Sequence, residues 1–317
     1  MMIHLTVIAI GLLLDRIIGD PPAWPHPVRW IGSLISKLTK KWNHGPKAYR
    51  NGFWMTGIVA ICAFSGALFL VLIGHSIHWT IGAAVEALLI AAGLAQKSLG
   101  DAAEEVYRPL IKNDLVKARE KLGWIVGRDT DRLNESEITR GVVETVSENT
   151  SDGITAPLFW AFLLGAPGLW LYKAVNTCDS MVGYKNEEFQ RFGYASARLD
   201  DLLNWIPSRI TGLLILTMTK NARSLTIRQR FVEWKRDAKK HPSPNSGWLE
   251  AATAIQLGVE LGGINTYKGV VSIRARMGTP VFPLEARHIH ETTKHMHLVT
   301  FWFFILFAVG GLLLELT

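Results

Sequence analysis

Long apolar runs alternate with short polar segments along this chain, and the longest runs predict helices that cross a membrane. Residues 53–74 are uncharged, and residues 77–95 contain a single acid, Glu86. Each run is long enough, as a helix, to cross a hydrocarbon layer of about 30 Å. Residues 3–14 and 298–314 form further apolar segments. Glu86 either has a function or faces the interior of the helix bundle, since a carboxylate inside a span is costly to leave in lipid.

Two other apolar segments are interrupted. Residues 154–172 contain four residues that break helices: Pro157, Gly165, Pro167 and Gly168. A second interrupted run covers residues 205–219. If both segments crossed the membrane fully, the polar run between them would lie on the opposite face from residues 98–153. We therefore expect re-entrant segments or segments buried in protein, where irregular backbone is tolerated at membrane depth.

The remaining segments predict helices and turns outside the membrane. A helix is expected to begin near Asn134 or Ser136, because both residue types are good N-caps. GGINTYKG at 262–269 has the composition of a turn. No segment gives a strong strand signal. The fold class is therefore predicted to be all-α, a polytopic integral membrane protein with helical cytoplasmic loops and broken or re-entrant apolar segments.

The alternation of apolar and polar segments divides the chain into five regions. They are N-terminal membrane segments with a proline-rich loop (1–97), a soluble helical region (98–153), broken membrane segments with a polar run (154–219), a basic cytoplasmic region (220–297) and a C-terminal span (298–317).

Composition and charge agree with a membrane location. Hydrophobic residues make up 49% of the 317 residues, the mean hydropathy is +0.18, and the net charge is +7. Basic residues cluster before the 53–74 run, which predicts a cytoplasmic loop by the positive-inside rule: Lys37, Lys40, Lys41, Lys47 and Arg50. The positive charge fits anionic membrane lipid or phosphate-bearing ligands, and we expect no nucleic acid partner.

The chain shows no sign of secretion or of a disulfide. Cys62 lies in an apolar run and Cys178 in a polar one, so a disulfide between these two cysteines is not expected. The apolar start lacks a basic leader and a small-residue cleavage site, so we interpret it as a retained membrane segment.

Paired acids precede the first broken segment. Glu144 and Glu148 lie one helical turn apart, and Asn149 and Asp152 follow. Such a face is usually only solvated. Carboxylates beside a membrane segment also suit a divalent cation such as Mg²⁺, which takes oxygen ligands.

Other polar clusters leave two interpretations open. Arg128 and Arg132 form either surface ion pairs or a clamp for phosphate. The proline-rich loop at 19–32 is either a stiff connector or a polar site, and HPSPNSGW at 241–248 is either a turn or a cradle for a polar ligand. Four histidines between 287 and 297 favour a polar collar over a metal site. No phosphate-binding glycine loop or other known catalytic motif occurs, so the residues alone do not identify a reaction.

Five blocks of sequence resemble a known family. They are LLDRIIGDPPAWPHPVRWIG, IVGRDTDRL, VETVSENTSDGITAPLFWAFLLGAPGLWLYKAVNTCDSMVGY, FGYASARLDDLLNWIPSRIT and HPSPNSGWLEAA. Together they resemble the cobinamide-phosphate synthases of cobalamin biosynthesis, the CobD/CbiB family. The resemblance implies a membrane ligase that joins adenosylcobyric acid to (R)-1-amino-2-propanol or its phosphate, using ATP and Mg²⁺. It also implies a corrinoid substrate and, as possible partners, other cobalamin-assembly enzymes.

The resemblance and the polar pattern together predict the site. The candidate catalytic residues are Glu144, Glu148, Asn149, Asp152, Asp179 and Ser180. The candidate phosphate- or nucleotide-binding residues are Arg128, Arg132, Lys173, Asn176, Lys185, Arg198 and Arg209. The candidate substrate-binding residues are Asp20, His26, Arg29, His241, Ser243 and Asn245, and the candidate metal ligands are Asp179, Asp200 and Asp201. Cys178 is expected to pack rather than react. We expect a multi-pass protein of the cell membrane with a cytoplasmic active site; the alternative is a corrinoid-binding or transport component without ligase turnover.

Overall fold

The computed structural model describes residues 2–21 and 25–316. Pro22, Ala23 and Trp24 of the proline-rich loop lie outside the described residues. The chain forms two compact units, and it passes between them several times. The first unit holds Met1–Lys97, Asp152–Asn204 and Leu306–Thr317, and the second holds Ser98–Ser151 and Trp205–Ile305.

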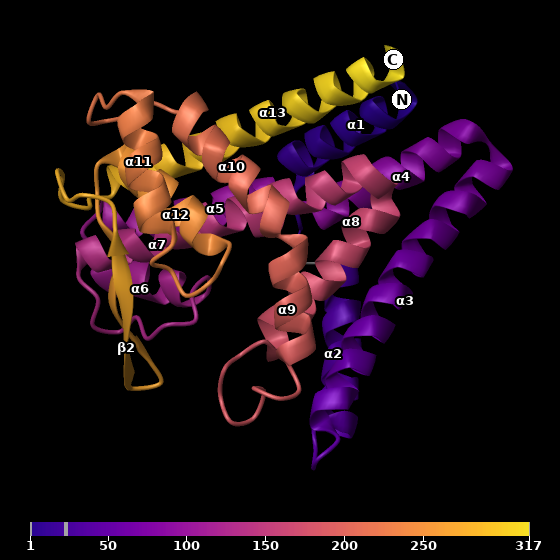
Figure 1. Cartoon of the computed structure of the whole chain (residues 1–317), viewed down its shortest axis with the longest axis horizontal. Coiled ribbons are helices and arrows are strands. Elements are labelled where there is room, and N and C mark those ends of the chain that lie inside the picture. The colour runs from indigo at the N-terminus through magenta and orange to yellow at the C-terminus, as the bar shows by residue number, and fades with distance from the viewer. Residues whose placement is uncertain (1, 22–24, 317) are drawn as a thin grey trace. The chain divides into compact units, whose positions relative to one another are not determined.

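The first unit is a bundle of helices. Its elements are α1 (Met2–Ile18), α2 (Pro27–Trp42), α3 (Ala48–Ile77), α4 (Trp79–Gly93), α8 (Ala156–Val182), α9 (Tyr194–Leu203) and the end of α13 (Arg287–Leu316). Figure 1 shows α2 beside α3 and α9 beside α8, and both pairs are in contact. A short π-helix, Ser151–Thr155, leads directly into α8.

The second unit combines helices with one hairpin. Its elements are most of α5 (Gln96–Leu110), α6 (Leu115–Gly123), α7 (Glu135–Thr150), α10 (Trp205–Met218), α11 (Ile227–Ala238), α12 (Ser246–Leu257), β1 (Leu261–Tyr267), β2 (Val270–Met277) and the start of α13. The core between α7, α12 and β1 is apolar and includes Val143, Ala254 and Leu261.

Four helical stretches in the described chain are long and apolar enough to cross a membrane. They are Ala48–Ile77, Trp79–Leu110, Glu135–Val182 and Arg287–Glu315. The predicted all-α polytopic membrane fold is therefore confirmed. The predicted start of a helix near residue 134 is also confirmed, because Asn134 and Glu137 form a capping box at the first turn of α7.

The first broken segment is a kinked helix inside the protein. Gly165 interrupts α8 with φ 66° and ψ −160°, a conformation open almost only to glycine. The break frees the backbone N–H of Ala166, which donates to Oε1 of Glu86 at 3.2 Å. Glu86 thus faces the bundle interior, where it caps the second half of α8. Because 72% of the most apolar stretch of Glu135–Val182 is buried, the expectation of a protein-buried segment is confirmed.

Side chains around α8 explain why the kinked helix stays in place. Trp170 donates its indole N–H to the carbonyl of Leu89 at 3.0 Å. The Cys178 thiol lies 3.8 Å from the sulfur of Met55 in a buried apolar cluster. Cys178 therefore packs, as expected, and both cysteines are free thiols.

The expectation of a simple turn at 262–269 was wrong. These residues form strand β1 and the start of a hairpin with β2, in antiparallel register with Tyr267 opposite Val270. Lys268 and Gly269 both have positive φ, as a two-residue hairpin turn of type I′ requires. The glycines that suggest a turn thus lie within the hairpin. Gly269 is in its two-residue loop, and Gly262 lies at the irregularity in strand pairing between Leu261 and Gly263.

Candidate functional site

Lys173 is the centre of a polar cluster in the first unit. It lies on α8 beyond the break and is half-buried. The carboxylates of Asp20, Asp152 and Asp15 are close enough to stabilise its ammonium charge. One cation among three acids, on a helix packed in protein, is a costly arrangement that favours a binding role.

A pocket of about 320 Å³ opens beside Lys173. It is lined by Asp20, Pro21, His26, Val28, Arg29, Ala92, Leu94, Ala95 and Lys173. His26 Nε2 lies 3.1 Å from Asp20 Oδ1, and its Nδ1 accepts the backbone N–H of Val28 at the start of α2. The structure thus brings together four residues that the sequence predicts for substrate and phosphate binding. The proline-rich loop is a wall of a pocket as well as a connector.

Asp200 anchors a second part of the same unit. Its Oδ1 accepts from the amide of Asn176 at 3.1 Å, and its Oδ2 accepts from the amide of Asn204 at 3.1 Å. Tyr172 donates to Asn204 Oδ1 at 2.9 Å, and its hydroxyl lies 3.3 Å from the backbone oxygen of Asp152. These bonds connect α9 to α8 and to the π-helix.

The acids predicted as metal ligands do not form a closed ligand set. No group of three His, Cys, Asp or Glu side chains in the described chain is arranged to hold a metal. Asp152, Asp179 and Asp200 nevertheless all lie within electrostatic range of Tyr172. Mg²⁺ that binds with a nucleotide commonly uses only one or two carboxylates, with phosphate and water completing its shell. These oxygen donors therefore fit such an ion.

Several predicted residues lie on the surface of this unit. Asp201 is half-buried; burial raises the pKa of its carboxyl, although Arg198 and Lys185 act in the opposite direction. Arg198, Lys185 and Ser180 are exposed, and the Ser180 hydroxyl donates to the backbone of α8 at Asn176.

A buried ion-pair network surrounds Glu144 in the second unit. Glu144 Oε2 accepts from Arg128 Nη2, and Oε1 accepts from Gly262 N at 2.8 Å and lies 3.5 Å from Arg140 Nη1. Arg128 and Arg140 also donate to Oδ1 of Asn265, at 2.7 and 2.9 Å. Both carboxylate oxygens are therefore engaged within the protein. This favours a structural role that fastens β1 to α7, rather than phosphate binding by Arg128.

Hydrogen bonds between its own residues fix the conformation of the HPSPNSGW loop. Ser243 donates its backbone N–H to His241 Nδ1 at 3.0 Å, and its hydroxyl accepts the backbone N–H of Asn245 and of Ser246, both at 3.2 Å. Ser246 in turn donates to Oε1 of the half-buried Glu148 at 2.8 Å. The structure thus places Glu148 beside His241 and Ser243 but leaves Glu144 in its own network.

Arg209 holds this loop from α10. It donates to Asn245 Oδ1 at 3.1 Å and to the carbonyl of Pro244 at 3.2 Å. Its guanidinium also lies over the rings of Trp205 and Trp248. These contacts make Arg209 a support of the loop.

The two remaining predicted residues, Arg132 and Asn149, belong to none of the clusters described above. Arg132 is exposed. Asn149 is half-buried and donates its amide to the carbonyl of Thr145, one turn back in α7.

The family model described as CobD/Cbib protein matches residues 8–296. The chain belongs to the CobD/CbiB family. It is 49% identical over 315 residues to "Cobalamin biosynthesis protein CobD" of Halalkalibacterium halodurans, covering 99% of both chains. It is 48% identical over 271 residues to "Cobalamin biosynthesis protein CbiB" of Salmonella paratyphi B, covering 84% of this chain and 85% of that protein. No solved structure gives a significant match.

Within this CobD/CbiB chain, sequence reasoning missed Glu250. It is 1% exposed, and its Oε1 lies 3.5 Å from His241 Nε2. Neither of its oxygens has a hydrogen-bond partner within residues 2–21 and 25–316. Burial, then Glu144 and Glu148, raise the pKa of Glu250 well above its ordinary range. Burial and Arg274 lower the pKa of His241. Burial thus favours the uncharged form of both side chains.

A sequence signal for Glu250 existed. It is the one charged residue between Ser246 and Val259, in a segment that is otherwise alanine-rich and apolar. A lone carboxylate in such a helix is almost never fully buried without a role or a partner. Asn265 and Tyr172, by contrast, act through partners far away in the sequence, and no local pattern marks them.

Proposed function

We propose that this protein forms an amide bond between adenosylcobyric acid and (R)-1-amino-2-propanol or its phosphate, with ATP, in cobalamin biosynthesis. The observation that carries the proposal is the match, over 99% of the chain, to a relative named as a cobalamin biosynthesis protein. The product would be adenosylcobinamide or its phosphate. We place the protein in the cell membrane, with its active site on the cytoplasmic side, where ATP is found.

The chemistry explains why acids and bases gather here. A carboxylate and an amine do not condense in water at neutral pH. In the proposed reaction a carboxylate oxygen attacks the γ-phosphorus of ATP, which gives an acyl phosphate and ADP. The amine nitrogen then attacks the acyl carbon and forms the carbon–nitrogen bond. The bond between the acyl carbon and the bridging oxygen breaks, phosphate leaves with that oxygen and the electron pair, and the proton on nitrogen passes to a base. The first step brings two anions together, and negative charge develops on the departing phosphate in the second, so fixed cations lower both barriers.

The pocket beside Lys173 suits the phosphate-bearing substrate. Lys173 and Arg29 would bind phosphate oxygens, and the His26–Asp20 pair would bind polar groups of a substrate. One or two of the carboxylates of Asp152, Asp179 and Asp200 would ligate Mg²⁺ together with phosphate oxygens, and the ion when bound would neutralise charge on the transferred phosphate. The main contribution of these residues would be orientation, because no covalent enzyme intermediate is needed.

Within the second unit considered by itself, one acid, Glu148, is a candidate for a base. Glu148 is half-buried and oriented by Ser246. Glu250 is not a candidate, because burial raises the pKa of its carboxyl and favours the protonated form, which cannot accept a proton. Glu144 is a weaker candidate, because its two oxygens already accept from Arg128 and Gly262.

The alternative is a corrinoid-binding or transport component. Broken membrane helices bind ligands in many transporters through the ends of their half-helices. In this chain the freed N–H of Ala166 is already bonded to Glu86. The break is thus closed by the protein itself, which argues against a transport site at that point.

An assay in detergent separates the two functions. Purified protein would be given adenosylcobyric acid, ATP, Mg²⁺ and either amine, and the corrinoid product would be weighed by mass spectrometry. We expect an amide with at least one of the amines and none without ATP. Corrinoid binding with no amide under any of these conditions would overturn the ligase proposal and favour the alternative.

A further inference from the structure

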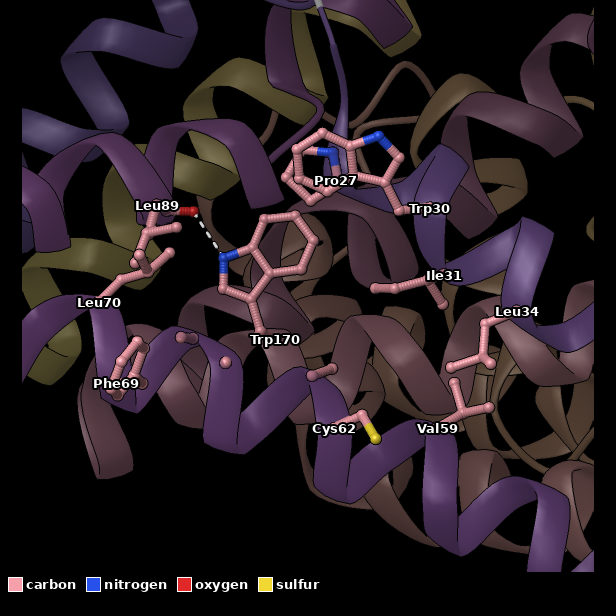
Figure 2. A pocket seen from close by; sticks show the side chains of 13 residues that line it. Pro27, Trp30, Ile31, Leu34, Val59, Cys62, Phe69, Leu70, Leu89 and Trp170 are labelled. Carbon is pink, nitrogen blue, oxygen red and sulfur yellow. Dashed lines mark hydrogen bonds between the residues drawn. The ribbon is translucent and has the colours of Figure 1, made fainter.

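An apolar pocket of about 440 Å³ lies within the first unit, and none of its lining residues lines the polar pocket beside Lys173. Figure 2 shows this apolar pocket. Its lining comes from α2, α3, α4 and α8. The volume is within the range of about 300–1,000 Å³ that is usual for small-molecule sites. None of the residues that line it is charged.

Small residues on α3 make the floor of the pocket. Ala63, Gly66 and Ala67 lie on one face of the helix, since they are spaced three and four residues apart. A Cβ added at Gly66 would meet no atom within 4 Å, so the space above it is open. Trp170 forms a wall, and because its N–H is bonded to Leu89 it offers the pocket only its ring (Figure 2). The pocket therefore suits a hydrocarbon occupant.

The surroundings of the pocket are also apolar. Only 28% of the most apolar stretch of α3 is buried, and Phe69 and Leu70 at the pocket are exposed. The exposed face of a membrane-crossing helix is in contact with acyl chains. A lipid chain is thus the apolar ligand with direct access to this cavity.

The face of α2 that lines the pocket carries positive charge farther along the helix. Trp30, Leu34, Lys37 and Lys41 share one face of this helix, because they are spaced four, seven and eleven residues from the first. Trp30 and Leu34 line the pocket, and Lys37 and Lys41 are exposed. Neither lysine has an ion-pair partner among the described residues, and α2 contains no acid. At about 1.5 Å per residue, Lys37 is one turn beyond Leu34.

We propose that this pocket binds one acyl chain of an anionic phospholipid, whose headgroup phosphate is bound by Lys37 and Lys41. The positive charge of this helix face favours a headgroup with net negative charge over a zwitterionic one, whose own cation opposes the two lysines. The proposal does not rest on the proposed reaction, since this pocket and the one beside Lys173 share no lining residue.

The pocket can be filled from its floor. Gly66→Leu puts a side chain into the open space, and Gly57→Leu is the matched control, since Gly57 is on the same helix, also faces open space and does not line the pocket. Native mass spectrometry of each protein with phosphatidylglycerol should show one tightly bound lipid for wild type and Gly57→Leu. Gly66→Leu should reduce the bound fraction by about tenfold, as expected when a few methylene groups lose their contacts. Equal lipid retention by Gly66→Leu and Gly57→Leu would overturn the proposal.

A second measurement uses a native cysteine as the reporter. Cys62 lines the pocket and is exposed, while Cys178 is buried, so a fluorescent thiol reagent reports on Cys62. A phospholipid with a nitroxide on its acyl chain should quench this label at low mole fraction when its headgroup is phosphatidylglycerol, and less with phosphatidylcholine. Lys37→Gln with Lys41→Gln should abolish that preference. Quenching that is equal for both lipids, or displacement of the lipid by adenosylcobyric acid, would overturn the proposal, and the second result would assign the pocket to the corrinoid.

Discussion

The stretches Ala48–Ile77 and Glu135–Val182 are both apolar enough to cross a membrane, yet the protein uses them differently. In the first, 28% of the most apolar stretch is buried, and in the second 72%. The exposed stretch has few polar residues between Phe53 and Gly74, whereas the buried one contains Glu144, Glu148, Asp152 and Lys173. Length and hydropathy therefore identify a span, and burial separates an exposed helix from one on which several proposed site residues lie.

The two stretches also differ in the regularity of their helical backbone. The long α3 has no interruption, whereas Glu135–Val182 contains a π-helix at 151–155 and the break at Gly165. A π-helix inside a longer helix is often found at a functional site. Neighbouring side chains can satisfy irregular backbone only where protein surrounds it, as Glu86 does here.

The largest effect is expected from Lys173→Met. Loss of a fixed cation that stabilises phosphate charge should lower the rate of amide formation by about 10²–10³-fold. Lys40→Met, at an exposed lysine of the same unit, is the control and should keep full activity. If Lys173→Met turned over at the wild-type rate, the buried helix would not carry the site.

Glu144→Ala should mainly reduce stability. It leaves Arg128 and Arg140 buried without their carboxylate, and breaking a buried pair costs about 3–5 kcal/mol. Glu104→Ala removes an exposed pair with Arg108 and should cost about 0.3–0.5 kcal/mol. Unfolding in detergent, followed by circular dichroism, gives both values. A variant at Glu144 that melts like wild type but makes no amide would show that Glu144 acts in the reaction instead.

Gly165→Ala tests the break itself. Its backbone conformation costs a residue with a side chain about 1–3 kcal/mol, and the new Cβ would lie 2.3 Å from Glu86 Oε1. Gly57→Ala in α3, where the added carbon meets no atom within 4 Å, is the control and should not lower the melting temperature. Equal melting temperatures for the two variants would mean that the kink is not fixed by this glycine.

A smaller, pH-dependent effect is expected at Asp237, outside both stretches. Burial alone would raise its pKa, but hydrogen bonds from Arg236, Lys240 and the N–H of Gly278 outweigh burial and lower the pKa to about 2. The folded state therefore favours the carboxylate, whose stabilisation is complete above the ordinary pKa of 3.8 and is lost as pH falls toward about 2. Asp237→Asn should melt below wild type at pH 7, and the difference should shrink below pH 4. A difference that stays constant to pH 2.5 would contradict the assignment.

The smallest effect is expected from Ile61→Ala on the exposed face of α3. Ile61 is 65% exposed, so the change should alter stability by less than about 0.5 kcal/mol. Leu169→Ala in α8, where the side chain is fully buried, should cost about 2–5 kcal/mol. Similar costs for the two variants would remove the distinction between the two helices.

Sequence reasoning worked where a feature depends on neighbouring residues. The Asn134 cap, the spans and the interruption at Gly165 each follow from local pattern. It did not work where the partner is distant. Glu86 caps Ala166 from 80 residues away, and Asn265 joins Arg128 and Arg140 through a hairpin whose glycines suggested only a turn. The site residues divide in the same way: the pocket side chains were named individually, but their grouping with Lys173 needed the fold.

The most direct test of the account follows one oxygen atom. Adenosylcobyric acid labelled with ¹⁸O in its free carboxylate would be converted by the detergent-purified protein with ATP, Mg²⁺ and the amine. If the carboxylate is phosphorylated before the amine attacks, one labelled oxygen must appear in the released phosphate for each amide formed. Amide formation with no label in phosphate, or with no dependence on ATP, would contradict the proposed reaction.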